Sequence, residues 1–295
     1  MLSTTLDKLT ERLERATILD KPSDALAALL GKVMPGGRVG DVASGTPIGH
    51  PLHPVLVTVP IGSWVAASYL DLTGGNGKAA KRLVGLGNLA ALPAVFTGAN
   101  DWLTTSAAER RVGLAHAILN DTAFALYVAS WLARRRGRRF KGAALALAGA
   151  GIVGTAGWLG GHLSYALGVG VDTTAFQHFP GEWTDVCAES DVRTDVPTGV
   201  EAAGVPVLLI REQGVVLALS DRCTHRGAPL HEGEVSDGCV TCPWHGSRFA
   251  LVDGSVKAGP ATRPQPVAEV RVLKGRVQVR RNDEPRELRT NPAGH

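Results

Sequence analysis

Charged residues are scarce in this sequence, and their sum is small. Only 20% of the 295 residues are Asp, Glu, Lys or Arg, and the formal net charge is +4. A nucleic-acid-binding protein is expected to present a broad basic surface, whereas the basic residues here are gathered into a few short runs. The composition therefore argues against a nucleic-acid partner, and the clustering is more typical of a membrane protein.

Cysteine is also scarce, with four residues in the chain. Two of them belong to a motif described below, which leaves Cys187 and Cys239. We expect each of these two to be a small buried side chain and not half of a disulfide. Cysteine usage alone does not indicate a redox compartment.

A short stretch combines two cysteines with two histidines. Cys223 and His225 form a C-x-H pair, Cys242 and His245 form a C-x-x-H pair, and sixteen residues separate His225 from Cys242. Two thiolates and two imidazoles predict a metal site, which either zinc or a [2Fe–2S] cluster could occupy. Structural zinc needs only these four donors, so the donors by themselves leave both alternatives open.

The residues around the four donors favour the cluster. Gly227, Pro229 and Leu230 follow the first pair, and Pro243, Trp244, Gly246 and Ser247 surround the second. The stretch resembles the two cluster loops of the Rieske [2Fe–2S] family in its ferredoxin-like branch. The resemblance covers about residues 180–282. It implies that Cys223 and Cys242 hold one iron, that His225 and His245 hold the other, and that an electron leaves through the imidazoles.

The sequence departs from the high-potential Rieske proteins of respiratory complexes. Those proteins carry a disulfide between the two loops, whereas Ala228 and Trp244 stand at these positions here. Ser247 matches their serine, but Phe249 replaces their tyrosine. Loss of a hydrogen bond to the cluster predicts an intermediate to low potential. The missing disulfide also argues against a quinol-oxidising subunit of a respiratory complex, although it leaves that subunit as an alternative.

A Rieske oxygenase needs a further domain with a mononuclear iron site, built from two histidines and one carboxylate. Only fifty residues follow His245, and His295 is the single histidine among them. We therefore expect an electron-transfer protein and not an oxygenase. The function predicted from the sequence is one-electron transfer to or from a redox protein or quinone, with a structural zinc domain on a membrane anchor as the alternative.

The first half of the chain contains four apolar segments, and they predict four membrane-spanning helices. They cover residues 55–70, 83–99, 112–133 and 142–171. Buried helices of a soluble bundle are the alternative, but the dearth of charges within the segments favours the bilayer. The region resembles a bacterial four-helix membrane domain of unknown function, through its His50-Pro51-Leu52-His53-Pro54 sequence and the glycine-rich end of the fourth segment.

The predicted architecture is multidomain, with an all-α transmembrane bundle followed by an all-β Rieske domain. Residues 1–44 form an amphipathic N-terminal region and a glycine-rich loop, and residues 45–172 form the membrane domain. Short alternating runs over residues 173–282 predict strands and hairpins. Residues 283–295 are polar and are expected to be a disordered tail.

Basic residues predict the orientation of the multi-pass protein in the cell membrane. Nine of them lie in the segments between spans one and two and between spans three and four, against three on the opposite side. The positive-inside rule then places the nine in the cytoplasm, and the Rieske domain on the extracytoplasmic side.

Three histidines lie at the entry of the first apolar segment or within the third and fourth, towards one face of the membrane. They are His53, His116 and His162. Polar residues at membrane depth often mark a cofactor or ion path. One hypothesis is therefore a second redox site, in which two of them bind haem b or contact a quinone. The alternative is that all three form hydrogen bonds to loops or headgroups.

Overall fold

The computed structural model describes residues 2–282, and the chain divides into two compact units. The helical unit contains the residues up to 35 together with 51–170, and the other unit contains 36–50 together with the residues from 171 onward. The predicted fold class, apolar helices followed by an all-β domain, is confirmed. The N-terminal region predicted to end at residue 44 is divided between the units, and the predicted disordered tail lies outside the described residues.

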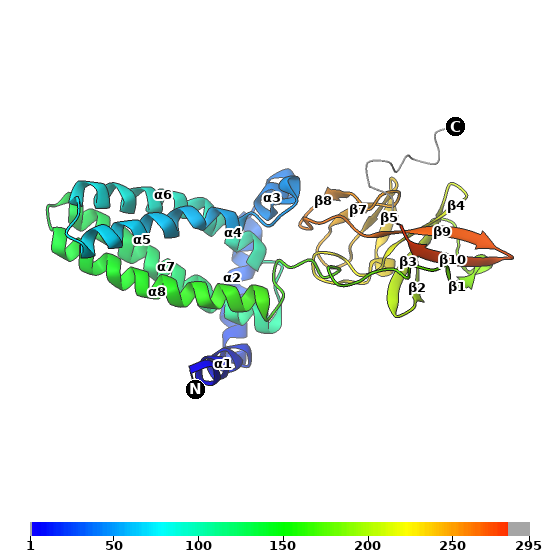
Figure 1. The fold of residues 1–295 in the computed structure, drawn as a ribbon, viewed down its shortest axis with the longest axis horizontal. Helices are drawn as coiled ribbons and strands as arrows, with labels where there is room; N and C mark the ends of the chain where they lie inside the picture. Colours follow the sequence, from blue (N-terminus) through cyan, green and yellow to red (C-terminus); the bar gives the residue numbers. More distant parts are fainter. Residues whose placement is uncertain (1, 283–295) are drawn as a thin grey trace. The chain divides into compact units, whose positions relative to one another are not determined.

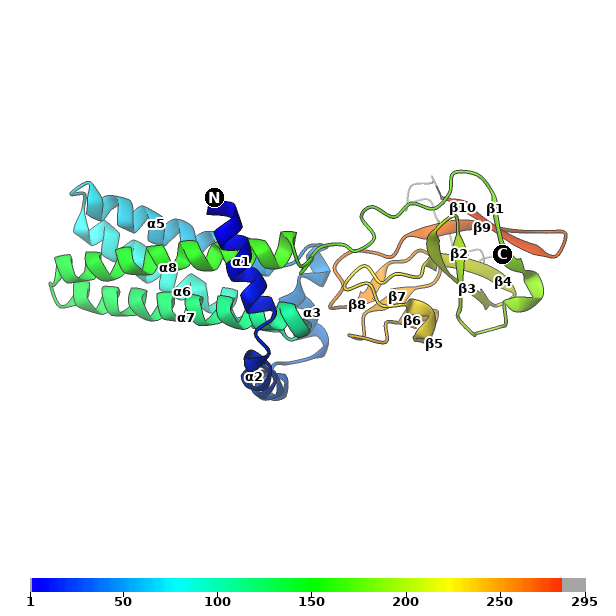
Figure 2. The ribbon, with the colours of Figure 1, turned by 90° about the horizontal axis from the view of Figure 1, so that it is seen from below.

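Four helical segments are long and apolar enough to cross a bilayer, and Figures 1 and 2 show them side by side. The first combines α4 with α5, and the others are single helices. Their bounds are His53–Leu56 for α4, Thr58–Leu72 for α5, Gly77–Trp102 for α6, Ala107–Arg135 for α7 and Arg139–Tyr165 for α8. All four contain the predicted segments except at the end of the last, which stops before residue 171. Gly168 and Gly170, both with positive φ, turn the chain away from the helix there.

The outer faces of these helices expose large aliphatic side chains, as lipid-facing helices do. On α6 they are Leu86, Leu89, Leu92 and Val95.

Polar groups cap the N-terminal ends of α6 and α7. The Asn76 side chain accepts hydrogen bonds from the first turn of α6, and Ser106 with Glu109 forms a capping box at the start of α7.

The first pair of helices is joined by a histidine. Nδ1 of His53 lies 2.9 Å from the carbonyl oxygen of Ala94 on α6. One turn further along α6, a Cβ atom on Gly98 would lie 2.8 Å from the His53 ring. A side chain at this position would therefore displace the imidazole from its acceptor.

The second pair repeats this arrangement at identical spacing. Nδ1 of His116 on α7 lies 2.8 Å from the carbonyl oxygen of Ala156 on α8, and a Cβ atom on Gly160 would lie 3.1 Å from the His116 ring. In each hairpin the acceptor alanine precedes the contacting glycine by one helical turn. The two helical hairpins therefore pack in the same way, a similarity that is not evident from their sequences alone.

The equivalence extends to the centre and the far end of the bundle. Trp64 packs on Gly87, Tyr127 packs on Gly149, and the two rings stack with centroids 4.1 Å apart. Near the opposite end from the histidines, Arg134 Nη1 donates to Asp71 at 2.9 Å, and the two side chains are 2% and 1% exposed. His53, Trp64 and Asp71 thus correspond, position for position, to His116, Tyr127 and Arg134.

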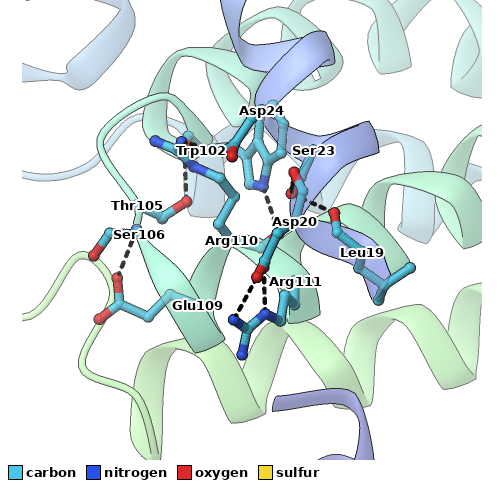
Figure 3. A network of polar contacts seen from close by, with 10 residues as sticks. All are labelled: Leu19, Asp20, Ser23, Asp24, Trp102, Thr105, Ser106, Glu109, Arg110 and Arg111. Atoms are coloured by element: carbon cyan, nitrogen blue, oxygen red, sulfur yellow. Dashed lines mark hydrogen bonds and ion pairs between the residues drawn. The ribbon is translucent and has the colours of Figure 1, made fainter. Parts of the chain in front are cut away.

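The N-terminal helices α1 (Leu2–Glu14) and α2 (Asp20–Val33) pack against the start of α7. Figure 3 shows the contact, in which the Arg111 guanidinium donates to both carboxylate oxygens of Asp20 at 2.5 and 2.8 Å. Arg110 donates to Asp24 at 3.0 Å, and its carbonyl accepts from the Trp102 indole. The amphipathic N-terminal region therefore packs on the protein's own helices.

The second unit contains two antiparallel sheets. A six-stranded sheet has the order β1-β10-β9-β4-β3-β2, and a four-stranded sheet has the order β5-β6-β7-β8. The strands of the larger sheet are β1 (Thr184–Ala188), β2 (Thr198–Ala202), β3 (Val205–Glu212), β4 (Val215–Ser220), β9 (Val267–Leu273) and β10 (Arg276–Arg281). Those of the smaller sheet are β5 (Glu234–Ser236), β6 (Cys239–Thr241), β7 (Arg248–Ala250) and β8 (Val256–Ala258).

The predicted hairpins are confirmed. β3 pairs with β4 from Val207↔Ser220 to Glu212↔Val215, and β9 pairs with β10 across the turn at Lys274 and Gly275. Both turn residues have positive φ, as a two-residue hairpin turn of type I′ requires. Leu208, Ile210 and Leu219 extend from the larger sheet into a core that also contains Cys223 and Cys242.

The glycine-rich loop that the sequence predicts at the end of the N-terminal region is helical over part of its length, so this prediction is wrong there. The end of α2 reaches Val33, and residues Gly37–Ser44 form α3, followed by a single 3-10 turn over Thr46–Ile48. Gly45 ends α3 in the left-handed conformation. Contacts with the loop after β8, described below, hold this glycine-rich helix in place, so tertiary packing overrides its weak intrinsic propensity.

Candidate metal centre

The first donor pair lies in a tight loop between β4 and the short 3-10 helix at Leu230–Glu232. The Cys223 N–H donates to the carbonyl of Ala228 at 2.9 Å, and the Gly227 N–H donates back to the carbonyl of Cys223 at 2.8 Å. Gly227 has a φ of 80°, a region that L-residues with a side chain rarely adopt. The glycine is therefore required to close the turn.

The second donor pair lies in a matching loop between β6 and β7. The Cys242 N–H donates to the carbonyl of Ser247 at 2.8 Å, and the Gly246 N–H donates to the carbonyl of Cys242 at 3.1 Å. Gly246 has a φ of 75°. Both cysteines are thus held by the same pair of backbone hydrogen bonds, although the spacing from cysteine to histidine differs between the loops.

The two loops bring all four donors together. The His225 and His245 rings lie with centroids 5.1 Å apart and are nearly perpendicular. Cys223 and Cys242 are buried, and their side chains are within hydrogen-bond range of each other. Backbone N–H groups of His225 and Arg226 point at the Cys223 sulfur, and those of Trp244 and His245 point at the Cys242 sulfur.

Both imidazoles have a buried nitrogen without a partner. Nδ1 of His225 and Nδ1 of His245 are inaccessible to solvent and form no hydrogen bond. Buried polar atoms in native proteins are almost always partnered, so two such atoms in adjacent rings call for a common explanation. A metal that accepts the nitrogen lone pairs supplies one. The residues therefore fit a metal group held by two imidazoles and two sulfurs.

The electrostatic surroundings keep the donors in states that bind metal. Burial, with smaller contributions from His245 and Arg226, lowers the pKa of His225 to about 3. Burial and Arg226 also lower the pKa of His245. Both rings are therefore neutral at pH 7 and keep a free lone pair.

The two thiols differ because they share a hydrogen bond. The bond from Cys223 lowers the pKa of Cys242 to about 6, assisted by the backbone N–H groups of Trp244 and His245. The same bond, together with burial, raises the pKa of Cys223. One sulfur is therefore poised to be a thiolate near neutral pH, and the loops stabilise negative charge on it.

Comparison with known proteins identifies the unit. Residues 182–274 match the Rieske [2Fe-2S] domain family, and residues 49–173 match the family described as predicted membrane protein (DUF2231). The ferredoxin subunit of anthranilate 1,2-dioxygenase from Burkholderia cepacia is 35% identical over 98 residues, which are 33% of this chain and 91% of the ferredoxin. The chain belongs to the Rieske [2Fe–2S] family.

Two further relatives share the Rieske domain. Ferredoxin CarAc from Metapseudomonas resinovorans is 36% identical over 98 residues, which are 33% of this chain and 92% of the ferredoxin. Human apoptosis-inducing factor 3 is 34% identical over 103 residues, which are 35% of this chain and 17% of that longer protein. A Rieske domain of this kind implies a [2Fe–2S] cluster. The family resemblances predicted for the two halves of the chain are both confirmed.

Of the loop positions that were compared with high-potential Rieske proteins, all but one are buried. Ala228 and Phe249 are fully buried, whereas the Trp244 side chain is 56% exposed. Ser247 is also buried, and its Oγ accepts a hydrogen bond from the Ala261 N–H at 2.9 Å. The hydroxyl proton of Ser247 is therefore not needed for this contact.

One residue that supports the Rieske loops, Gln265, is not indicated by any motif in the sequence. Gln265 is fully buried; its Nε2 donates to the carbonyls of Ser220 and Arg222 at 2.7 and 2.6 Å, and its Oε1 accepts from the Thr224 N–H at 3.2 Å. It thus ties the chain before and after Cys223 to the strand that follows. Nothing in the spacing of the motif marks it, because its partners lie about forty residues away.

The three membrane histidines are used differently from those of the Rieske domain. His53 and His116 are bound to helix carbonyls, and His162 Nε2 lies 2.8 Å from Glu14 Oε1 on α1. The Asn120 amide also donates to His116 Nε2 at 3.1 Å. Haem b and quinone are not supported by these contacts. The partners are helix carbonyls and a side chain of α1, whereas the alternative expected loops or headgroups.

Proposed function

We propose that the protein is a membrane-anchored electron carrier whose [2Fe–2S] cluster is held by Cys223, His225, Cys242 and His245. The observation that carries the proposal is the pair of buried, unpartnered Nδ1 atoms in adjacent imidazole rings, beside two buried cysteines. One ferredoxin relative is named as the ferredoxin subunit of anthranilate 1,2-dioxygenase, and by analogy the partner of this chain is a redox protein.

The arrangement of donors favours a two-iron cluster over the zinc alternative. The two imidazole rings form one pair, with centroids 5.1 Å apart, and the two cysteines form another, within hydrogen-bond range of each other. A structural zinc site requires four donors converging on one point, whereas a Rieske cluster divides them into two pairs. When bound, the cluster accepts and releases one electron at a time.

The residues around the cluster affect both the stability of its reduced state and the route by which the electron leaves. Four backbone N–H groups directed at the cysteine sulfurs stabilise negative charge, which favours the reduced state. His225 and His245 are half-buried, and the exposed Trp244 ring lies edge-on to His245 with centroids 6.4 Å apart. A partner docking over Trp244 would exclude water beside the imidazoles through which the electron passes.

We also propose that the Rieske domain lies on the extracytoplasmic side of the cell membrane. The proposal depends on the basic residues at the α5–α6 and α7–α8 connections: Lys78, Lys81, Arg82, Arg134, Arg135, Arg136, Arg138, Arg139 and Lys141. Arg134 is neutralised by Asp71, which leaves eight basic residues on this side. The opposite side has Arg38, Arg110 and Arg111. Two of these three are also paired, Arg110 with Asp24 and Arg111 with Asp20.

Metal analysis of purified protein tests the cluster. Two irons and two acid-labile sulfides per chain, with a Rieske EPR signal after reduction, are expected. One zinc per chain without labile sulfide would establish the alternative. A redox titration then selects among classes of donor and acceptor.

Cysteine labelling tests the orientation. A cysteine placed at Arg136 should be protected from an impermeant thiol reagent in intact cells, while one placed at Lys274 in the Rieske domain should be labelled. The opposite pattern would place the cluster in the cytoplasm.

A further inference from the structure

Two segments of the Rieske unit continue directly into the membrane-spanning helices. Residues 36–50 precede α4, and the residues from 171 onward follow α8. The chain therefore passes between the units three times, at residues 35–36, 50–51 and 170–171. Residues 36–50 and 171–181 lie outside the Rieske family match at residues 182–274, so their contacts within this unit are additions to the matched domain.

The segment before α4 is bound to the loop that follows β8. Asp41 Oδ1 on α3 accepts a hydrogen bond from the Gly259 N–H at 2.8 Å, and Thr46 Oγ1 donates to the carbonyl of Ala261 at 3.0 Å. A Cβ atom on Gly259 would lie 2.4 Å from Thr46 Oγ1 and 2.9 Å from Asp41 Oδ1. Only glycine at this position permits the approach of both side chains.

The loop after β8 in turn holds both ligand loops. The Ala261 N–H donates to Ser247 Oγ at 2.9 Å, two residues from His245. Thr224, between Cys223 and His225, donates through Oγ1 to the carbonyl of Arg263 at 2.8 Å. Asp41 and Thr46 therefore act on the ligand loops through one intervening stretch of backbone.

The segment after α8 reaches the first ligand loop without an intermediary. Thr173 donates through its N–H to the carbonyl of Thr224 at 3.1 Å, and through Oγ1 to the carbonyl of Cys223 at 2.7 Å. The Asp172 carboxylate accepts from the N–H and hydroxyl of Thr174, which fixes the turn around Thr173. The carbonyl of Cys223 thus has two donors, the Gly227 N–H and the Thr173 hydroxyl.

We propose that Asp41, Thr46 and Thr173 are positioning residues for the cluster, through which the chain entering the first span and leaving the last sets the geometry of the ligand loops. The inference rests on the proposed function. The potential of an iron–sulfur centre depends on the hydrogen bonds its sulfurs receive, and here those come from backbone N–H groups of the same loops. Releasing the loops weakens these bonds and destabilises the reduced state.

Redox titration of the full-length protein in detergent, followed by EPR, tests the proposal. Thr173→Val, Asp41→Ala and Thr46→Val should each lower the midpoint potential and alter the g-values of the reduced signal. Thr173→Ser and Asp41→Asn keep a hydroxyl and an acceptor oxygen, so they should restore both properties towards wild type. Gly259→Ala should lower the potential in the same way, because its Cβ displaces Thr46 and Asp41 from the loop.

Thr198→Val is the matched control, since Thr198 Oγ1 also donates to a carbonyl but lies in β2 of the larger sheet. Its potential and g-values should equal those of the wild type. If Thr173→Val fails to assemble a cluster, Asp41→Ala answers the question from one contact further away. Potentials and g-values unchanged in every variant, even with lower cluster content, would overturn the positioning role alone. A wild-type protein without a Rieske signal would overturn the proposed function itself.

Discussion

The two sets of histidines in this protein differ in what their Nδ1 atoms contact. In the Rieske domain, Nδ1 of His225 and His245 is buried and has no partner. In the membrane helices, Nδ1 of His53 and His116 lies against a backbone carbonyl at 2.9 and 2.8 Å. A carbonyl oxygen can only accept a hydrogen bond, so Nδ1 of His53 and of His116 carries the proton and only Nε2 keeps a lone pair. The role of Nδ1 thus differs between the two sets: it forms an interhelical hydrogen bond in the membrane helices and has no partner in the Rieske domain.

Each set of histidines lies in a local arrangement that occurs twice in the chain. In the membrane half, a glycine on the facing helix admits the ring to a carbonyl. In the Rieske half, a glycine within the loop closes a turn that leaves the ring without an acceptor.

Removing a sulfur donor should give the largest effect. Cys223→Ala and Cys242→Ala should abolish the cluster, since the remaining three donors cannot complete both irons. Iron, labile sulfide and EPR on purified protein measure this. Cys187→Ala and Cys239→Ala are the matched controls, because these free thiols lie in β1 and β6 outside the loops. A normal Rieske EPR signal in Cys223→Ala would refute the ligand assignment.

Changing the charge of a nitrogen donor should come next. His245→Cys replaces a neutral ligand by a thiolate, and the potential should fall towards that of a four-thiolate centre, a difference on the order of several hundred mV. A redox titration measures the shift. The corresponding His116→Cys should leave the potential of the cluster unchanged, and an equal shift in both variants would remove the distinction between the two sets.

Filling the space that admits a membrane imidazole should reduce stability without affecting the cluster. Gly98→Leu places a side chain where the His53 ring lies, at a cost of about 1–3 kcal/mol for overpacking. Thermal unfolding in detergent should show the loss, while the EPR signal of the folded protein stays the same. Gly151→Leu is the control, because a Cβ atom there meets nothing within 4 Å. Equal losses in both would mean that the close approach to His53 is unimportant.

Truncating the membrane histidines should have the smallest effect. His53→Ala and His116→Ala each remove one hydrogen bond between helices, which is worth about 0.6 kcal/mol on average in membrane proteins. Their visible spectra should match the wild type, without a Soret band in either. A Soret band in the wild type that disappears in these variants would reinstate the haem hypothesis.

Much of the fold follows from local patterns in the sequence. The four apolar segments and the hairpins at Gln213-Gly214 and Lys274-Gly275 appear where hydropathy and turn residues indicate them. The four donors could be found because a C-x-H and a C-x-x-H pair carry their own flanking glycines. Each of these signals is confined to a few consecutive residues.

The parts that the sequence did not reveal depend on partners far along the chain. Residues 37–44 contain two glycines and look like a loop, but Asp41 binds Gly259, 218 positions away. Arg134 was counted among the basic residues of a connecting segment, yet it is buried against Asp71. Gln265 carries no motif at all. Only the folded arrangement shows which distant groups each of them meets.

The ion pair between Asp71 and Arg134 also bears on symmetry. The two residues occupy equivalent positions in the two helical hairpins, just as His53 and His116 do. Two identical hairpins related by an exact twofold axis would bring like charges together here, Asp against Asp or Arg against Arg, and burial would make the repulsion severe. Complementary charges are possible only when the two hairpins differ in sequence at this position. This single contact therefore requires two non-identical hairpins, and it favours their pairing with each other over the pairing of two identical copies.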